Sequence, residues 1–559
     1  MAQPKLLLDF IYEHEKANSG KVFLTQPIGG GQVTDYTWGQ TMDQARRMAT
    51  HLKAQGFEPG SRIAILSKNC AHFFMAELAI WMAGHTTVAI FPTETAETVG
   101  YVLNHSGASL LFVGKLDTWE QQIAGVPKEM PCIAFPLAPK TTYDTWDAII
   151  GRTQPLQGNA QRGPKDLALL MYTSGSTGQP KGVMHNFQGA TDAAQGFVDY
   201  IKRGLGEGNE IRVLSYLPLA HIFERACVEC ACLLDGRAHV YFAESLDTFL
   251  ADLNRARPTL FVSVPRLWLK FQQGVFAKMP PKKLDRLLSI PILGRIVGRK
   301  VLRGLGLDQV KFANSGSAPI PPQLIDWYRR IGLNLLEGYG MTEDFAYSHA
   351  STEEFNAPGY VGIPQKGVQV KLSEEGEILI KSPGTMVGYY KRPDLDAEVF
   401  TADGFFRTGD KGERQPSGML KLTGRVKEMF KTSKGKYVAP APIENQINAN
   451  PLIELSMVSG VGQPSAYAIV VLAEAVRPKQ NDPEFRAHVE TELAQLLKDV
   501  NSNLADYEKL QMLVVAKEPW SVENGLLTPT MKIRRNRIEG AIESRVEGWF
   551  KGSAKVLWA

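Results

Sequence analysis

The stretch Leu167–Gly182 reads LALLMYTSGSTGQPKG, and it decides how the rest of the sequence is interpreted. Its first half is an apolar run that predicts a buried strand, and its second half combines glycines, hydroxyls and Lys181. Glycine lets backbone N–H groups approach a ligand closely, hydroxyls add donors, and lysine adds a point charge. Because Gly182 and not Ser or Thr follows Lys181, the loop is not a Walker A loop. We therefore predict a strand followed by a polyphosphate-binding loop of another kind.

Outward from this loop, helical and strand patterns alternate over the first four hundred residues. The expected elements are helices over residues 40–56 and 73–83, and strands at Arg62–Leu66, Thr86–Ile90, Ser109–Val113 and Thr259–Ser263. Short apolar strands between helices predict an α/β fold with parallel sheets covered on both faces. From about Gly359, short strands separated by glycine turns predict a β-rich subdomain. We expect a large N-terminal domain over residues 1–424 and a small α+β domain over residues 425–559.

Length and composition exclude several classes of protein. A chain of 559 residues is too long for one hydrophobic core, and 44% hydrophobic with 21% charged residues excludes a disordered chain. The net charge of +4 gives no general attraction to nucleic acid, so no nucleic-acid partner is expected. The cysteines are too scattered for a disulfide framework, and the apolar run Leu6–Leu8 ends at Asp9, too early for a signal peptide. A cytoplasmic protein with structural thiols is expected.

Further motifs follow the loop in order along the chain. They are Ser315–Pro319 (SGSAP), Gly338–Glu343 (GYGMTE), Phe406–Asp410 (FRTGD), Leu422–Arg425 (LTGR) and Thr528–Lys532 (TPTMK). Together with YTSGSTGQPKG, this series resembles the acyl-adenylate-forming superfamily, which includes acyl-CoA synthetases, peptide synthetase adenylation domains and firefly luciferase. The resemblance covers nearly the whole chain. It implies an enzyme that uses ATP to activate a carboxylic acid as an acyl-adenylate.

The resemblance also implies which residues bind and act on the nucleotide. The residues implied in ATP and AMP binding are Thr173, Ser174, Gly175, Ser176, Thr177, Gly178, Lys181, Gly316, Ser317, Ala318, Gly338, Tyr339, Gly340, Thr342, Asp410 and Arg425. The implied catalytic residues are Lys532, Thr342, Glu343 and His221.

The chemistry gives a physical reason for this set. A carboxylate attacks the α-phosphorus of ATP, so an anion meets a polyanion and cations must offset the repulsion. Glu343 would hold Mg²⁺ through hard oxygen ligands, and Lys532 would bridge the carboxylate and the α-phosphate. Thr342 would donate to the α-phosphate, while Lys181 would help pyrophosphate leave. Tyr339 would cover the adenine, and Asp410 would accept from both ribose hydroxyls.

A second step requires the adenylate to meet the thiol of coenzyme A. The resemblance implies that the C-terminal domain is a mobile lid, which rotates about a hinge at Lys427 and withdraws Lys532. The rotation would bring in a CoA-side loop with Ser433, Lys434, Gly435 and Lys436. Gly435 suits a pantetheine arm because no side chain obstructs it.

The acid is indicated by Leu217–Arg225, LPLAHIFER, which resembles the corresponding motif of long-chain fatty acyl-CoA synthetases. His221 would lie at the mouth of the acyl pocket, although an ordinary histidine at a helix start is the alternative. The expected activity is a fatty acid–CoA ligase. The alternatives are a fatty acyl-AMP ligase that delivers to a carrier protein, and a non-catalytic fatty acid or nucleotide binder.

A basic segment interrupts this pattern between Lys278 and Lys311. It carries nine basic residues against Asp285 and Asp308, and apolar residues lie between them. A basic amphipathic segment suits the surface of an anionic membrane, so a peripheral membrane contact is one expectation. A solvated helix face on a folded domain is the other.

Overall fold

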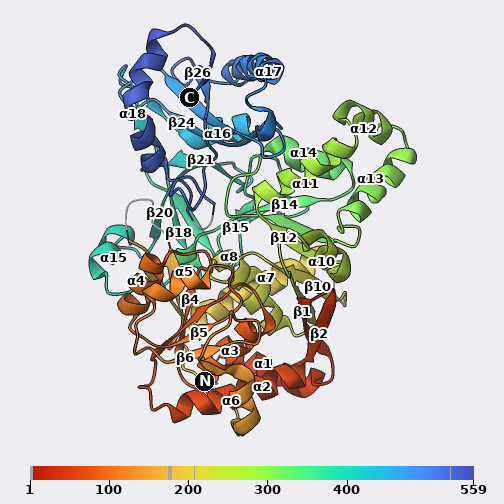
Figure 1. Cartoon of the computed structure of the whole chain (residues 1–559), viewed down its shortest axis with the longest axis vertical. Helices are drawn as coiled ribbons and strands as arrows, with labels where there is room; N and C mark the ends of the chain where they lie inside the picture. Colours follow the sequence, from red (N-terminus) through yellow and green to blue (C-terminus); the bar gives the residue numbers. More distant parts are fainter. Residues whose placement is uncertain (1–3, 174–178, 207, 529–530) are drawn as a thin grey trace.

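The computed structural model describes residues 4–173, 179–206, 208–528 and 531–559. Figure 1 shows the large N-terminal part of the chain, from red to green, and a smaller C-terminal part in blue at one end of the long axis. The phosphate-loop residues Ser174 to Gly178 predicted from the sequence lie outside the described residues, as do Pro529 and Thr530.

The sheet that carries the phosphate loop runs in the order β19–β9–β8–β4–β3–β5–β6–β7. Its strands are β3 (Arg62–Leu66), β4 (Thr86–Ile90), β5 (Ala108–Val113), β6 (Cys132–Ala134), β7 (Asp144–Thr145), β8 (Leu167–Thr173), β9 (Lys181–Asn186) and β19 (Gly388–Tyr389). The expected strands at residues 62–66, 86–90 and 109–113 are confirmed as β3, β4 and β5, which pair in parallel. The expected parallel pairing joins β8, β4, β3, β5, β6 and β7, but the sheet as a whole is mixed, because β9 pairs antiparallel with β8 and β19 with β9.

Helices accompany this sheet, and the two expected over residues 40–56 and 73–83 are present as α2 (Trp38–Ala54) and α3 (Ala71–Met82). The others include α1 (Leu7–Asn18), α4 (Ala96–Ser106) and α7 (Phe187–Leu205). Helix α2 begins at a capping box in which the Thr37 hydroxyl accepts the Gln40 N–H, and α4 ends at Gly107 in the left-handed region. Every residue of α3 is buried, which explains why this segment is apolar on all sides.

Two further sheets complete the α/β part. One has the order β10–β11–β1–β2, with β10 (Ile211–Ser215), β11 (Ala238–Phe242), β1 (Val22–Gly29) and β2 (Gln32–Thr37). The other has the order β12–β13–β14–β15–β16, with β12 (Leu260–Ser263), β13 (Phe312–Ser315), β14 (Leu335–Tyr339), β15 (His349–Ala350) and β16 (Ile363–Pro364). Both are also mixed, since β1 pairs antiparallel with β2 and β14 with β15.

The expected β-rich region and the C-terminal α+β region are both present. The first is the sheet β17 (Gln369–Leu372), β18 (Glu377–Lys381), β20 (Phe406–Arg414) and β21 (Leu420–Arg425). The second is the sheet β24 (Ile453–Ser459), β25 (Ala466–Leu472), β26 (Leu510–Val515) and β27 (Val556–Trp558), with helices α16 (Pro440–Asn448), α17 (Pro483–Ser502) and α18 (Arg535–Lys551). A short hairpin of β22 (Phe430–Lys431) and β23 (Tyr437–Val438) lies between them along the chain.

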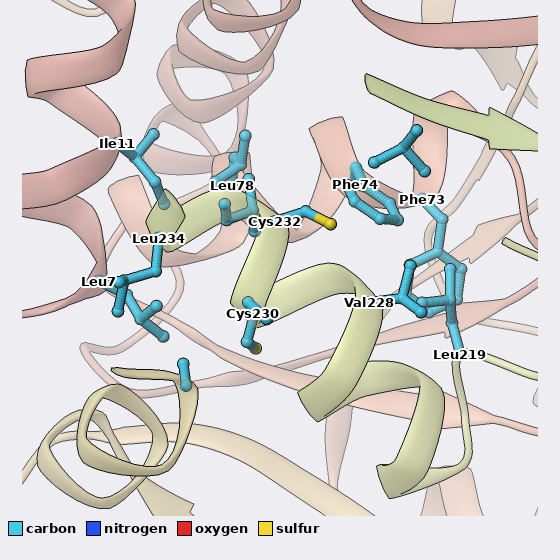
Figure 2. Close-up of a cluster of buried hydrophobic side chains, with 14 of the residues drawn as sticks. Leu7, Ile11, Phe73, Phe74, Leu78, Leu219, Val228, Cys230, Cys232 and Leu234 are labelled. Atoms are coloured by element: carbon cyan, nitrogen blue, oxygen red, sulfur yellow. The ribbon is translucent and has the colours of Figure 1, made fainter. Parts of the chain in front are cut away.

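The main core lies under the helix that carries three of the cysteines. Figure 2 shows Cys230 and Cys232 among side chains of α1 and α3, such as Leu7, Ile11 and Phe74. The segment Arg225–Cys230 is a π-helix that continues into α9 (Ala231–Asp235), and the three cysteines of these two elements are buried. Burial raises the pKa of both thiols well above the usual range, so they are packing groups.

No helix in the part of the chain that the structure describes is long and apolar enough to cross a membrane. The apolar stretch from Phe73 to Pro92 is instead divided between α3 and β4.

Candidate active site

The phosphate loop connects two paired strands, so the ends of the loop are fixed even though its central residues lie outside the described part. Thr173 at the end of β8 pairs with Lys181 at the start of β9. The ammonium group of Lys181 lies 5.2 Å from the centre of the Tyr389 ring. The Tyr389 hydroxyl donates to Glu343 Oε1 at 2.7 Å. The structure therefore brings the lysine of one predicted motif to the carboxylate of another.

Glu343 lies in a 3₁₀ turn, Thr342–Asp344, directly after β14. The backbone of this turn is held by the buried His185 ring, which donates to the Thr342 carbonyl at 2.8 Å, and by the Met386 N–H, which donates to the Glu343 carbonyl. Burial lowers the pKa of His185 to about 4, so the ring is neutral at pH 7 and one ring N–H makes this bond.

The two adjacent carboxyl groups of this turn differ in environment. Asp344 is buried, its Oδ1 accepts the Met341 N–H at 2.8 Å, and burial raises its pKa to about 8. Glu343 is only half-buried. A protonated, buried Asp344 supports the turn, whereas Glu343 is the group able to meet a cation. Among the described residues no cluster of three His, Cys, Asp or Glu side chains forms a metal cage, and Mg²⁺ is commonly held by one or two carboxylates together with substrate phosphates.

Asp410 connects the β-rich region to Tyr339 at the end of β14. It lies on β20 opposite Arg425 on β21, and the Arg425 Nε–H donates to its Oδ1 at 2.9 Å. The Tyr339 hydroxyl donates to its Oδ2 at 2.7 Å. A carboxylate oxygen has two lone pairs, so each Asp410 oxygen retains one acceptor site. Tyr339, Asp410 and Arg425, predicted separately from three motifs, therefore form a single cluster.

The predicted adenine-side residues lie at the ends of two neighbouring parallel strands. Ser315 on β13 pairs with Glu337 on β14, so Gly316, Ser317 and Ala318 lie beside Gly338 and Gly340. A Cβ added at Gly340 would lie 2.5 Å from the Ala346 backbone, which explains the glycine there. Ser317 has a φ of +68°, an uncommon conformation for a residue with a side chain. Such outliers concentrate at ligand-binding turns.

Lys532 comes from the C-terminal region and lies near the charged side chains of the other motifs. Lys532 is exposed to solvent. Desolvation by the surrounding protein lowers the pKa of its ammonium group, and the Arg425 cation lowers it further. Asp410, Glu428 and Glu343 act in the opposite direction and raise it. The Lys532 N–H donates to the Thr528 hydroxyl oxygen at 3.1 Å. Lys532, from the last motif of the chain, therefore lies within electrostatic range of Glu343 and Asp410.

His221, in the LPLAHIFER segment, borders the cleft that these residues form. Its Nδ1 accepts the Phe223 N–H at 3.2 Å at the start of α8 (Ile222–Glu224), and its ring packs edge-on to Phe91. Burial first, and then the Lys532 cation, lowers the pKa of His221 to about 3, so the ring is neutral. The Phe223 ring lies 3.1 Å from where a Cβ of Gly316 would stand. The segment predicted at the acyl pocket thus touches the predicted adenine-side turn.

The predicted hinge closely follows Arg425 of this cluster, and the predicted CoA-side loop lies further along the chain. Lys427 follows the end of β21, and the loop with Ser433, Lys434, Gly435 and Lys436 connects β22 to β23. The Ser433 N–H donates to Gln463 at 2.9 Å, so the loop is held within the C-terminal region. Gly435 has a φ of +78°, which favours glycine at this turn.

Sequence reasoning missed several polar residues of the site. Tyr389, His185, Asp344 and Glu337 lie outside the residues predicted to act, and their places depend on packing between distant segments. Tyr389 is 46 residues from Glu343 in the chain, and no pattern of spacing connects them.

Comparisons with known proteins agree with this geometry. The model of the family described as "AMP-binding enzyme" matches residues 12–390, and the model described as "AMP-binding enzyme C-terminal domain" matches residues 428–553. The chain is 28% identical over 587 aligned residues to a long-chain-fatty-acid–CoA ligase of Mycobacterium bovis, covering 96% of both chains. It is 27% identical to the human long-chain-fatty-acid–CoA ligase 1, covering 93% of this chain and 84% of the human one.

A solved structure shows the same fold at lower identity. The adenylation domain of a carboxylate reductase from Mycobacterium chelonae superposes with a TM-score of 0.81 at 23% identity, covering 99% of this chain and 92% of that one. The fold class predicted from the sequence is therefore confirmed. Since the first family model alone spans more than half of the sequence, this chain belongs to the family of AMP-binding enzymes and is an adenylate-forming enzyme that activates a carboxylic acid.

Proposed function

We propose that this enzyme is a fatty acid–CoA ligase that uses ATP and Mg²⁺, with a preference for long chains. The observation that carries the proposal is that Lys532, from the C-terminal region, lies close enough to Asp410 and Glu343 for both carboxylates to raise its pKa. Adenylation requires a cation where an incoming carboxylate approaches the α-phosphate, and Lys532 would supply it. The similarity to long-chain-fatty-acid–CoA ligases and the LPLAHIFER segment support a fatty acid as the substrate.

Each cleft residue has a role in this proposal that its contacts support. Asp410, held by Tyr339 and Arg425, would accept the ribose hydroxyls with its remaining lone pairs. Glu343 would hold Mg²⁺, with Tyr389 fixing the carboxylate; the bound ion would neutralise charge on the phosphates. Thr342 would donate to the α-phosphate. Neutral His221 would line the entry of the acyl chain beside Phe223.

The remaining nucleotide contacts follow the motifs. Gly316, Ser317, Ala318, Gly338 and Gly340 would surround the adenine, and Thr173, Lys181 and the loop between them would hold the outgoing pyrophosphate. The structural support is that the adenine-side turns end the neighbouring strands β13 and β14, while the phosphate loop connects the paired strands β8 and β9 of another sheet.

For the second step we propose a domain rotation, with the boundary after Gly424 and the hinge at Lys427. The support is that Lys532 lies in the cleft while the loop 433–436 is bonded to its own domain. Such an arrangement suits adenylation, and the thiol step would require the loop in place of Lys532. A cytoplasmic location, supported by five free cysteines, and contact with an anionic membrane are also proposals.

The test is release of AMP from ATP and a fatty acid, with and without coenzyme A, over acids of graded length. A ligase releases AMP slowly until coenzyme A is added and then forms acyl-CoA in equal amount. A fatty acyl-AMP ligase would not respond to coenzyme A, and a binding protein would release no AMP. A chain-length optimum at short or aromatic acids would contradict the proposed substrate class. The control is Asp403→Ala, an exposed aspartate on the same β-rich region.

A further inference from the structure

A helical hairpin extends from the side of the large domain (Figure 1). It consists of α12 (Pro281–Leu288) and α13 (Leu293–Gly304). Helix α13 rests on the body through Gly298, where an added Cβ would lie 2.5 Å from the Ile331 carbonyl oxygen. Its contact with α12 is equally close at Gly294, 2.4 Å from the Leu288 carbonyl oxygen. These close approaches hold the hairpin firmly and turn the opposite face of α13 outward.

The tip of this hairpin exposes apolar side chains. Of the 15 large apolar residues that are exposed in the described part of the chain, four fall between residues 290 and 296. They are Ile290, Ile292, Leu293 and Ile296, and Ile292 and Ile296 are 74% and 60% exposed. Scattered exposed apolar residues need no explanation, but a cluster at a projecting tip indicates a binding surface.

The backbone at the tip is strained in a way that keeps Ile292 in solvent. Ile292 has φ +68° and ψ −57°, and the Leu293 N–H donates to the Pro291 carbonyl at 2.8 Å. This is the rare γ-turn with a positive φ, which is unfavourable for a β-branched residue. Glycine would occupy the turn with less strain. Strain that places an isoleucine in water is consistent with a partner that covers it.

Cations surround the apolar tip. The acidic residues of the hairpin region are already paired, Asp285 with Arg330 at 2.9 Å and Asp308 with Arg303 at 3.9 Å. Several exposed cations have no ion-pair partner among the residues that the structure describes: Lys278, Lys282, Lys283, Arg286, Arg295, Arg299 and Lys300. The hairpin therefore combines an apolar tip with exposed cations on both of its helices.

We infer that this tip docks on the surface of an anionic lipid bilayer, with its isoleucines in the boundary between headgroups and acyl chains. Near such a surface each cation strengthens binding by about fivefold, and buried apolar side chains add to it. A second copy of the chain would bring like charges together. Nucleic acid would place phosphates on the cations but leave the isoleucines without a partner, and residues 281–304 contain no aromatic side chain for base stacking.

The test is co-sedimentation of the full chain with vesicles of phosphatidylcholine, with or without phosphatidylglycerol. The wild type should bind the anionic vesicles at low salt and leave them at about 0.5 M salt, because exposed charges are screened. Replacing Lys282, Lys283, Arg295, Arg299 and Lys300 by glutamine should weaken binding by about tenfold or more. The matched control removes the same charge from exposed lysines elsewhere, by replacing Lys128, Lys140, Lys479, Lys498 and Lys517 with glutamine.

A second pair of variants separates the apolar contribution from the charge. Ile292→Gly should weaken vesicle binding while the melting temperature stays equal or rises, since glycine relieves the turn. Ile296→Ser should also weaken binding with every cation in place. An exposed isoleucine away from the hairpin, replaced in Ile123→Ser, serves as the control.

The inference rests on the membrane contact proposed above and names the surface that makes it, and it fails independently of the proposed activity. All of these variants should retain activity on a water-soluble short acid, because none lies in the cleft. The inference is overturned if the wild type does not sediment with anionic vesicles at low salt, or if the remote-lysine control weakens binding equally. It is also overturned if the hairpin variants change only the oligomeric state in sedimentation velocity, which would indicate a second copy as the partner.

Discussion

Two arginine–carboxylate clusters in this molecule contain the same chemical groups but differ in access to water. In the core, Arg225 lies between Glu77 and Glu229, and none of the three side chains is exposed. In the cleft, Arg425 holds Asp410 while its own side chain remains 52% exposed. Removing one partner from a fully buried cluster leaves a buried charge unpaired, so the fold depends on every member. A partly exposed cluster keeps acceptor sites that a ligand can reach.

The core cluster has an uneven charge balance. Arg225 Nη1 donates to both glutamates, at 2.7 Å for Glu229, and Arg225 also lies over the Phe73 ring. Burial first, together with the Glu77 charge, raises the pKa of Glu229 well above its usual range despite Arg225. Burial beside a second carboxyl group therefore disfavours the ionised form of Glu229. The π-helical turn at Arg225–Cys230 positions this arginine, which connects α3 to the segment that follows His221.

The largest expected effect is on stability in the core. Arg225→Met should lower the free energy of unfolding by about 3 to 5 kcal/mol, because it leaves buried carboxyls without their cation. Arg425→Met should lower it by less than about 1 kcal/mol, since exposed pairs contribute little. Urea unfolding measures both. Replacing Glu77, Arg225 and Glu229 together by Leu, Met and Leu should recover most of the loss, and equal effects of the two single variants would contradict the comparison.

In the cleft, the expected effect is on nucleotide binding. Asp410→Ala should raise the KM for ATP by about ten- to a hundredfold, because hydrogen bonds to a charged group are lost, with little change in unfolding. Steady-state kinetics over a range of ATP concentrations checks this. Asp403→Ala, on the exposed side of the same region, should leave the KM unchanged. If Asp410→Ala lowered the free energy of unfolding but left the KM for ATP unchanged, this cluster would be structural, like the one in the core.

A smaller effect is expected at Tyr389. Tyr389→Phe keeps the ring beside Lys181 but removes the hydrogen bond to Glu343, so the Mg²⁺ concentration for half-maximal activity should rise by about fivefold. The neighbouring Tyr390→Phe, whose hydroxyl contacts the Ser106 carbonyl at 3.4 Å, is the matched control. An unchanged Mg²⁺ requirement in Tyr389→Phe would argue against the role proposed for Glu343.

The smallest effect concerns pH. Burial raises the pKa of Glu337 to about 8, and among the described residues the Ile320 N–H is the one donor to its carboxyl group, at 3.4 Å. Its folded pKa lies above its unfolded pKa, so its contribution to stability is present at low pH and is lost as pH rises toward 8. Glu337→Gln should therefore gain stability relative to the wild type between pH 5 and 8. If the melting temperatures of the wild type and Glu337→Gln differed by the same amount at every pH in this range, the raised pKa of Glu337 would be contradicted.

The sequence was sufficient for parts of the molecule that depend on local pattern. The strands Arg62–Leu66 and Thr86–Ile90 were predicted to the residue, because apolar and β-branched runs end at clear breaks. The site residues were indicated differently, by the resemblance of an ordered series of motifs to the acyl-adenylate-forming superfamily. The antiparallel pairing of β8 with β9, the π-helical turn and the Tyr389–Glu343 bond were not predicted, since strand direction and contacts between distant segments depend on packing.

The most direct test of the account compares the two half-reactions in Lys532→Ala. If Lys532 reaches the cleft to join carboxylate and α-phosphate, fatty-acid-dependent exchange of pyrophosphate into ATP should fall by about a hundredfold or more. Thioester formation from supplied acyl-adenylate and coenzyme A should stay at the wild-type rate, because that step would not use this lysine. Equal loss of both half-reactions, or no loss of exchange, would contradict the account.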